Sequence, residues 1–466
     1  MRNRAIGLRR RTSALTGPRA GVAARTARAL LVLPVLLTLG ACSGGVDFAP
    51  ERTASIPVAR KPAPARAVRS SHPAMQPQAL AAAEANFPRC VAELGEKARA
   101  RGVSAQGVRT YTAGLTPDMS IMAKLDTQPE FTRTTGDYVT SLVSDTRIQR
   151  GREAMTANAA VFEAVERTYG VDKYVVAAIW GIETNYGTVR GTYPVLQATA
   201  TLACVGRRQA YFRDEFVAAL QIVDRGDIPE SHLRGSWAGA FGLTQFMPTA
   251  FQRDAVDFDG DGHRNVVDSV ADAMGSTGAK LRRGGWVAGR SWGYEVQLPR
   301  GFDYRLADKS IVKPMAEWAS LGVRRVAGRP FANGAEAGYL LLPAGAEGPA
   351  FVMTGNFKAL LSYNPADAYA LAIGHLADRL RGGDPFVTPW PADQRPLARG
   401  ERIELQQRLA SMGYEVGTPD GVMGAKTRDA VRDFQIRAGL VPDGLPDVAV
   451  LEHARRNPAG YRQAGL

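Results

Sequence analysis

Residues 174–187 read YVVAAIWGIETNYG, an apolar run that carries a single acid, Glu183, near its end. The apolar residues from 174 to 180 are spaced as in a helix that packs against its neighbours. A lone carboxyl group at such a place must be exposed, paired, or kept neutral by desolvation. A neutral carboxyl suits a general acid, because a general acid must still hold its proton near neutral pH. A solvated or structurally paired Glu near a helix end is the alternative that this stretch alone leaves open.

A second motif follows at residues 236–249, which read SWAGAFGLTQFMPT and begin with Ser236. The small residues allow a ligand to approach the backbone closely. Gln245 offers both a donor and an acceptor to an amide or hydroxyl group. The motif therefore indicates either a ligand-binding loop or a tightly packed turn without a ligand.

The third motif, DFDGDGHRNVVD at residues 257–268, has the twelve-residue spacing of a calcium-binding loop. A glycine occupies position six, where such a loop turns sharply, and position seven contributes a backbone carbonyl. The last position holds Asp instead of the usual Glu, which shortens its reach. We expect a structural Ca²⁺ (or Na⁺) here rather than a signalling ion, with a metal-free acidic turn as the alternative. The predicted ligands are Asp257, Asp259, Asp261, His263, Asn265 and Asp268.

The fourth motif is Tyr363-Asn364-Pro365, followed by Tyr369. Sugars are recognised by aromatic stacking and amide hydrogen bonds, which Tyr363, Asn364 and Tyr369 can provide. Asn364 is also a natural helix N-cap, and the sequence leaves both interpretations open.

The pattern around the four motifs predicts a mainly α protein. Residues 81–281 have helical spacing, and a further helix is expected over 365–380. Between them, short apolar or alternating runs predict the strands of a small insert, at 294–298, 338–342 and 351–353. We therefore expect a catalytic domain over 81–385. A linker is expected over 386–399, where Gly and Pro interrupt the pattern.

Residues 400–460 form a separate unit with two amphipathic helices, one around Leu405 and Leu409 and one around Val431 and Phe434. A glycine-rich turn lies between them. This unit resembles the small helical peptidoglycan-binding domain of many wall enzymes. The resemblance rests on a pattern between residues 405 and 435 that reads LQQRL, GY, DG, G, T, AV and FQ. A small three-helix wall-binding domain is therefore predicted, with a generic three-helix interaction module as the alternative.

The chain carries 58 Lys and Arg against 45 Asp and Glu, a net charge of +13. Eight of the arginines precede residue 42 and no acid does, so the remainder carries 13 − 8 = +5. The basic balance therefore belongs mostly to the leader, and no nucleic-acid partner is expected.

The leader has the features of an export signal. Its apolar run, residues 29–39, is too short to span a membrane. Residues 39–42, LGAC, match a bacterial lipobox, so we expect a signal peptide over 1–41, a lipid on Cys42 and a flexible tether over 42–80. An ordinary signal with an incidental Cys42 is the alternative.

Two further cysteines, Cys90 and Cys204, would then lie in an oxidising compartment. An even pair in such a compartment indicates a disulfide.

Together and in this order, the four motifs resemble the lytic murein transglycosylase B family over residues 85–382. The resemblance implies a lysozyme-like α+β catalytic domain, with Glu183 as the single catalytic acid/base and a metal in the 257–268 loop. It implies no cofactor for the chemistry itself. The residues that it assigns to saccharide and stem-peptide contacts are Ser236, Gln245, Tyr363, Asn364, Tyr369, Arg207, Arg208 and Tyr211.

The implied reaction is cleavage of the bond between N-acetylmuramic acid and N-acetylglucosamine, with closure of a 1,6-anhydro ring. The implied partners are glycan strands and stem peptides, and we expect a monomeric outer-membrane lipoprotein that faces the periplasm. Two alternatives stay open. A muramidase of the same fold would need a second acid, for which Asp214 and Glu215 are candidates, and a non-catalytic tether would leave Glu183 structural.

Overall fold

The computed structural model describes residues 72–126 and 133–457, and within them the stretch around Glu183 forms α7 (Lys173–Thr184). Asp172 caps this helix by accepting a hydrogen bond from the Tyr174 backbone N–H at 2.9 Å. The helix ends where Asn185 and Tyr186 adopt left-handed backbone, with φ of 49° and 57°. This turn folds the Tyr186 ring back onto α7, where a Cβ at Gly181 would lie 2.5 Å from the ring. Glycine is therefore needed at position 181.

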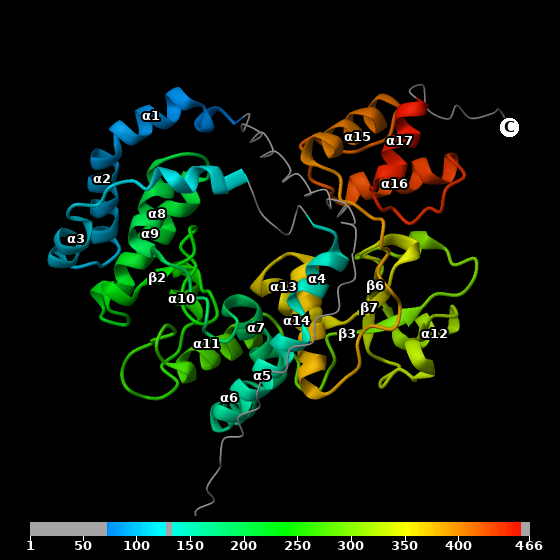
Figure 1. Cartoon of the computed structure of the whole chain (residues 1–466), viewed down its shortest axis with the longest axis horizontal. Helices are drawn as coiled ribbons and strands as arrows, with labels where there is room; N and C mark the ends of the chain where they lie inside the picture. Colours follow the sequence, from blue (N-terminus) through cyan, green and yellow to red (C-terminus); the bar gives the residue numbers. More distant parts are fainter. Residues whose placement is uncertain (1–71, 127–132, 458–466) are drawn as a thin grey trace, which may run out of the picture. The chain divides into compact units, whose positions relative to one another are not determined.

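Helices enclose α7 on several sides, and its residues from Val175 to Gly181 are buried. The helices α5, α6, α11 and α14 pack against it (Figure 1). The bounds of these four are Asp145–Ala157, Ala159–Tyr169, Val270–Arg283 and Asp367–Arg381. The prediction of a mainly helical catalytic domain is thus confirmed, and α7 lies at its centre.

Of the remaining helices before the insert, α4 (Thr135–Leu142) packs on α14, whereas most of the others pack around α9 (Gln209–Asp224). Polar caps start several of them: Ser104, for example, accepts a hydrogen bond from the Gly107 backbone N–H. Pro77 occupies the first turn of α1, a position that suits proline, so the helical part begins within the predicted tether. The bounds are α1 (Pro77–Ala85), α2 (Phe87–Ala100), α3 (Ala105–Thr112), α4 (Thr135–Leu142), α8 (Val195–Cys204), α9 (Gln209–Asp224) and α10 (Pro248–Asp254).

The insert contains a five-stranded antiparallel sheet of order β4-β6-β7-β3-β5. The three predicted strands are its central strands, and they pack against a small core that includes Trp318. The short edge strands and α12 (Met315–Ser320) were not predicted. Two-residue strands show no alternation, and a six-residue helix is too short to show a helical period. The strand bounds are β3 (Gly293–Gln297), β4 (Lys313–Pro314), β5 (Arg324–Arg325), β6 (Ala337–Leu341) and β7 (Ala350–Met353). A separate two-residue pair joins β1 (Tyr193–Pro194) to β2 (Arg234–Gly235).

Two helices return the chain from the insert to the catalytic core. After β7, α13 (Gly355–Tyr363) packs on α11 and α14. The chain after α14 also has defined contacts: the Phe386 ring stacks on His375 with centroids 3.7 Å apart, and Trp390 lies against Gly136 of α4. The predicted linker is therefore partly packed on the catalytic domain.

The C-terminal unit consists of α15 (Arg399–Ser411), α16 (Ala425–Arg437) and α17 (Val448–Arg456), drawn orange to red in Figure 1. They share a core of their own, in which Leu405, Leu409, Val431, Phe434 and Leu451 are buried. The predicted three-helix domain is thus present.

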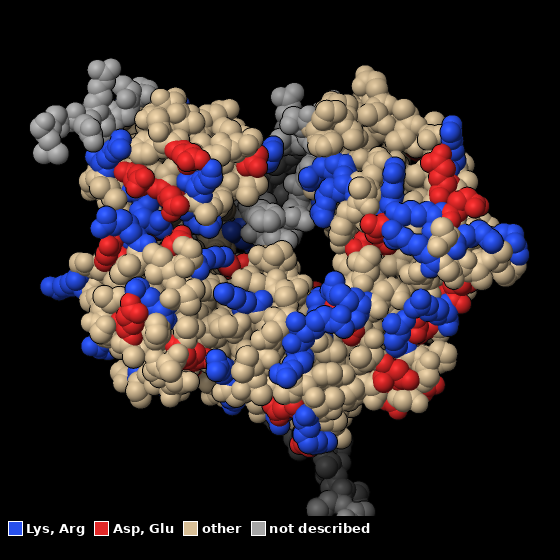
Figure 2. Space-filling model, turned by 180° about the vertical axis from the view of Figure 1, so that it is seen from behind, with Lys and Arg blue, Asp and Glu red and all other residues tan. Residues whose placement is uncertain are grey.

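Surface charges of both signs are interspersed on the face shown in Figure 2. Within the described residues, none of the helices is long and apolar enough to cross a membrane. The predictions for residues 1–71, including the signal peptide, Cys42 and most of the tether, lie outside the described residues.

Candidate active site

Glu183 lies in the last turn of α7, half-buried, and meets a tyrosine from α14. The Tyr369 hydroxyl donates a hydrogen bond to Glu183 Oε1 at 2.5 Å. Tyr369 is 3% exposed, and burial together with the nearby Glu183 raises its pKa well above the usual value. The phenol therefore stays protonated and acts as a fixed donor to one carboxyl oxygen. This contact joins the first and fourth sequence motifs.

A second tyrosine, Tyr363, connects Glu183 to the 236–249 motif. Its hydroxyl donates to the Thr244 carbonyl at 2.6 Å. Burial raises the pKa of Tyr363, with a further contribution from Glu183, so this hydroxyl also stays protonated. Tyr363 is the last residue of α13, which places it beside the start of α14.

The turn at residues 242–245 is fixed from three helices. The Thr184 hydroxyl of α7 donates to the Leu243 carbonyl at 2.6 Å, and the Thr277 hydroxyl of α11 lies 3.0 Å from that of Thr244. Tyr363 supplies the third contact. These anchors hold Gln245 in a left-handed conformation (φ 50°), which a non-glycine residue rarely adopts without surrounding support. The loop is therefore set in a defined shape before any ligand is present.

Four of the five predicted saccharide residues lie on this loop or at the turn before α14, whereas the fifth, Tyr369, is buried within α14 against Glu183. Gln245 is half-buried, and its amide donates to the Gly242 carbonyl at 3.0 Å. Ser236 is half-buried as well, and its Oγ accepts from the Ala240 backbone N–H at 3.1 Å. Asn364 does not cap α14, whose N-cap is Ala366; its side-chain carbonyl instead accepts from the Ala366 N–H. The N-cap interpretation of Asn364 was wrong by two positions, because the helix starts after Pro365 and Ala366.

The predicted stem-peptide residues form their own cluster at the start of α9. Arg207 donates to the Leu125 carbonyl, and the Arg208 guanidinium lies 4.8 Å from the centre of the Tyr211 ring. Tyr211 is 40% exposed, and burial of its hydroxyl next to Glu215 raises its pKa to about 12. Arg208 has a left-handed backbone (φ 68°), so the entry to α9 is strained. Arg208 and Tyr211 of this cluster are exposed, whereas Arg207 is half-buried.

Both candidates for a second catalytic acid are engaged in structural contacts. Asp214 pairs with Lys97 at 2.8 Å and with Arg101 at 3.0 Å. Glu215 is 1% exposed and accepts from the backbone N–H and the hydroxyl of Thr249. Both carboxylates are therefore occupied by contacts within the fold.

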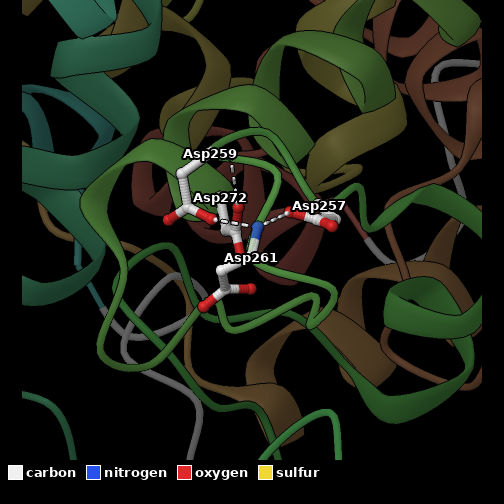
Figure 3. Close-up of side chains that lie close together, drawn as sticks. All are labelled: Asp257, Asp259, Asp261 and Asp272. Atoms are coloured by element: carbon white, nitrogen blue, oxygen red, sulfur yellow. Dashed lines mark hydrogen bonds between the residues drawn. The ribbon is translucent and has the colours of Figure 1, made fainter.

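Four carboxylates converge where the 257–268 loop meets the start of α11, a region called the acidic loop below, as Figure 3 shows. One carboxylate oxygen from each of Asp257, Asp259, Asp261 and Asp272 lies within 4.8 Å of the others. The first three side chains are exposed, whereas Asp272 is buried in the first turn of α11. Backbone N–H groups of the loop point into the cluster, for example from Gly262 to Asp257 Oδ2 at 2.9 Å. This oxygen-rich set fits a hard cation such as Ca²⁺.

The structure and the sequence differ over the last position of this loop. Asp268 lies 2.9 Å from His232 Nδ1 and accepts from the Asn265 side-chain amide at 3.2 Å, away from the carboxylate cluster. Asn265 in turn accepts from the Asp268 backbone N–H, and the His263 side chain is exposed. Asp272 takes the place that the twelve-residue pattern gave to Asp268. The signal for Asp272 was an acid in the first turn of the next helix, outside that pattern.

A disulfide joins Cys90 of α2 to Cys204 of α8, with the two sulfurs 2.00 Å apart. It links helices far apart in sequence. The sequence did not indicate the side chains that contact residues 243–246 from α7 and α11, which are Thr184, Thr277 and Lys280. Buried hydroxyls and a buried amine carry no pattern of their own.

Comparisons with known proteins show which families the chain is similar to. Residues 86–378 match the family described as Transglycosylase SLT domain, and residues 398–453 match the family described as Putative peptidoglycan binding domain. Membrane-bound lytic murein transglycosylase B of Escherichia coli (strain K12) is 35% identical over 217 residues, 45% of this chain and 57% of that protein. The chain thus matches little more than half the length of this curated relative.

Solved structures extend the similarity over more of the chain. SltB3 from Pseudomonas aeruginosa, in complex with NAG-anhNAM-pentapeptide, is 44% identical with a TM-score of 0.77, covering 79% of this chain and 99% of that one. A second structure of SltB3 holds NAG-NAM-pentapeptide. Slt35 from Escherichia coli, in complex with calcium, is 27% identical with a TM-score of 0.54, covering 64% of this chain and 92% of that one.

Proposed function

Because the chain belongs to the Transglycosylase SLT domain family, we propose that it is a lytic transglycosylase acting on peptidoglycan. It cleaves the β-1,4 bond between N-acetylmuramic acid and N-acetylglucosamine and leaves a 1,6-anhydromuramoyl end. The observation that carries this proposal is the carboxyl group of Glu183, which Tyr369 of α14 holds by a hydrogen bond beside the anchored loop. Hydrolases of this kind use two carboxylates, and here Asp214 and Glu215 are both occupied.

One carboxyl group is sufficient for this reaction. Glu183 donates its proton to the glycosidic oxygen, the bond from that oxygen to C1 of the muramic acid breaks, and the sugar becomes oxocarbenium-like. The C6 hydroxyl of the same sugar then attacks C1 while Glu183 accepts the hydroxyl proton. Because nucleophile and electrophile belong to one sugar, the attack has a high effective concentration. Glu183 ends protonated again, ready for the next turnover.

Tyr369 orients the carboxyl group through both steps. As a permanent donor to Oε1, it directs the proton transfers to the other oxygen and stabilises the carboxylate between the two steps. The glycan contacts come from Gln245, Ser236, Tyr363 and Asn364, which lie on the anchored loop and the turn before α14. Arg207, Arg208 and Tyr211 offer contacts to the stem peptide, whose carboxylates suit arginine.

Mass spectrometry of the products tests the proposal. The mature chain is incubated with purified murein sacculi, and the released muropeptides are weighed. Anhydro ends are expected; reducing ends, heavier by one water, would make the enzyme a muramidase. Absence of released muropeptides would leave a wall-binding protein.

The C-terminal domain, residues 398–453, holds the enzyme on peptidoglycan. A Glu183→Gln chain should still sediment with sacculi, because the change lies outside this domain. Loss of sedimentation in that variant would contradict the separation of binding from catalysis.

The acidic loop holds a structural Ca²⁺ (or Na⁺). The convergence of Asp257, Asp259, Asp261 and Asp272 supports this, as does the calcium-bound Slt35 of the same fold. The ion would fix the start of α11, which carries Thr277 against the substrate loop. It takes no part in the bond cleavage.

The enzyme is exported, lipidated on Cys42 and anchored as a monomer to the outer membrane, facing the periplasm. The lipobox at residues 39–42 and the membrane-bound relative support this location. Labelling with a radioactive fatty acid in cells tests it: label in the wild-type chain and none in Cys42→Ala is expected. Equal labelling of both would contradict lipidation at this residue.

A further inference from the structure

A lysine lies buried behind the proposed active site. Lys280, on α11, is 8% exposed, and its Nζ lies 3.7 Å from the centre of the Tyr363 ring and 5.1 Å from that of Phe246. In the part of the chain that the structure describes, no carboxylate oxygen lies within 4.0 Å of the Lys280 Nζ, so the lysine has no direct ion pair there. Aromatic faces, not a direct salt bridge, therefore hold this ammonium.

The charged groups around Lys280 come from two other helices. Glu183 of α7 and Asp254 of α10 interact with it favourably, and Arg253 of α10 unfavourably. Asp254 is already paired, with Arg253 at 2.7 Å and with Arg283 at 3.1 Å. Desolvation lowers the pKa of Lys280 to about 8, so the amine is mostly charged at neutral pH. Asp254 thus already has two arginine partners, and Glu183 is the second carboxylate whose negative charge favours the ammonium form of Lys280.

We propose that Lys280 is a positioning residue of the transglycosylase reaction: its ammonium fixes the Tyr363 ring and balances the carboxylate that Glu183 becomes after giving up its proton. This rests on the function proposed above. Lys280 positions the substrate loop through Tyr363: the ammonium lies over the Tyr363 ring, and the Tyr363 hydroxyl donates to the Thr244 carbonyl of that loop. The electrostatic part acts at the step where Glu183 is an anion waiting for the C6 hydroxyl proton.

Three variants separate charge from shape. Lys280→Met keeps the length of the side chain and removes its charge, and Lys280→Arg keeps the charge. Arg282→Met is the matched control, because Arg282 lies on the same helix but is exposed and donates to the Trp286 carbonyl. All three are compared with the wild type by circular dichroism and then by kcat and KM on a soluble glycan oligomer across pH.

The expected result is a loss of kcat of about 10- to 100-fold in Lys280→Met with KM changed little, as for a misplaced catalytic group. The alkaline limb of its pH profile should also move to higher pH, because the carboxylate form of Glu183 loses a favourable charge. Lys280→Arg should keep the alkaline limb of the wild type, and Arg282→Met should keep both limb and kcat. A folded Lys280→Met with an unmoved limb would overturn the proposal.

A measurement on the folded wild type covers the case in which Lys280→Met does not fold. The Nζ resonance of Lys280, identified by its loss in Lys280→Arg, is titrated by nuclear magnetic resonance in wild type and in Glu183→Gln. Coupling between two sites is reciprocal, so removing the Glu183 charge should lower the pKa of Lys280. Equal values would overturn the proposal. This coupling is measured without turnover, so its failure is distinct from a failure to find anhydro products.

Discussion

The protein places carboxyl groups in two contrasting surroundings. Glu183 is half-buried, and a phenolic hydroxyl from a helix far away in sequence donates a hydrogen bond to its carboxyl group. The acidic loop gathers four carboxylates, three of them exposed, within 4.8 Å. A single acid among aromatic rings can exchange one proton, whereas like charges so close together repel and call for a cation. The number of carboxyl groups that lie together and the groups around them thus distinguish a catalytic carboxyl group from a structural one, whereas the residue type does not.

The largest effect is expected when the carboxyl group of Glu183 is replaced by an amide. Glu183→Gln should lower the release of anhydromuropeptides by at least about 1,000-fold, because the amide cannot donate to the glycosidic oxygen or accept from the C6 hydroxyl. Product mass spectrometry with purified sacculi measures this, with thermal unfolding as a control for folding. Residual turnover within 10-fold of the wild type would place the catalytic acid elsewhere.

The phenolic donor can be removed without changing the ring. Tyr369→Phe should lower kcat by about 10- to 100-fold with little change in KM, since a hydrogen bond to a charged group contributes about 1.5–3 kcal/mol. Steady-state kinetics on a soluble glycan oligomer measure the split. A rise in KM at constant kcat would instead make Tyr369 a substrate-binding residue.

A cation bound at the acidic loop should stabilise the folded chain, and replacing Asp268 should not remove this stabilisation. Saturating Ca²⁺, at about 100 times its Kd, should stabilise the folded chain by about 2.7 kcal/mol, and a chelator should reverse this. Calorimetry with and without Ca²⁺ compares Asp272→Asn with Asp268→Asn. The calcium effect should vanish in the first variant and persist in the second, because Asp268 faces His232. The opposite pattern would restore the twelve-residue assignment.

The smallest expected effect concerns pH and the buried surroundings of Glu183. The pKa of Lys280 is about 8 in the folded chain against 10.5 in the unfolded chain, so between these values the unfolded state binds more protons. Stability then rises with pH, by about 2 kcal/mol from pH 7.5 to 9.5. Denaturant unfolding measures it, and Lys280→Met should lack this rise. A rise of the same size in the variant would show that another group titrates.

Local patterns predicted a large part of the fold. The apolar run before Glu183, the short apolar or alternating runs of the three central strands and the amphipathic helices of the C-terminal domain each indicate residues that must be buried. The two-residue strands β4 and β5 and the helix α12 escaped, because segments so short show no period. The glycine-rich loop pattern gave three of the four clustered carboxylates, and the fourth came from the helix that follows.

The sequence by itself determined which residue types carry the chemistry: a lone Glu after an apolar helix, an amide loop, a run of acids and a tyrosine pair around Asn364. The tertiary structure alone decided their partners. Tyr369 meets Glu183 across 186 residues, Tyr363 meets Thr244 across 119, and Lys280 lies on the Tyr363 ring. Such contacts depend on how α7, α11, α13 and α14 pack together. A local pattern fixes which face of a helix is buried, but packing of distant helices fixes which side chains meet there.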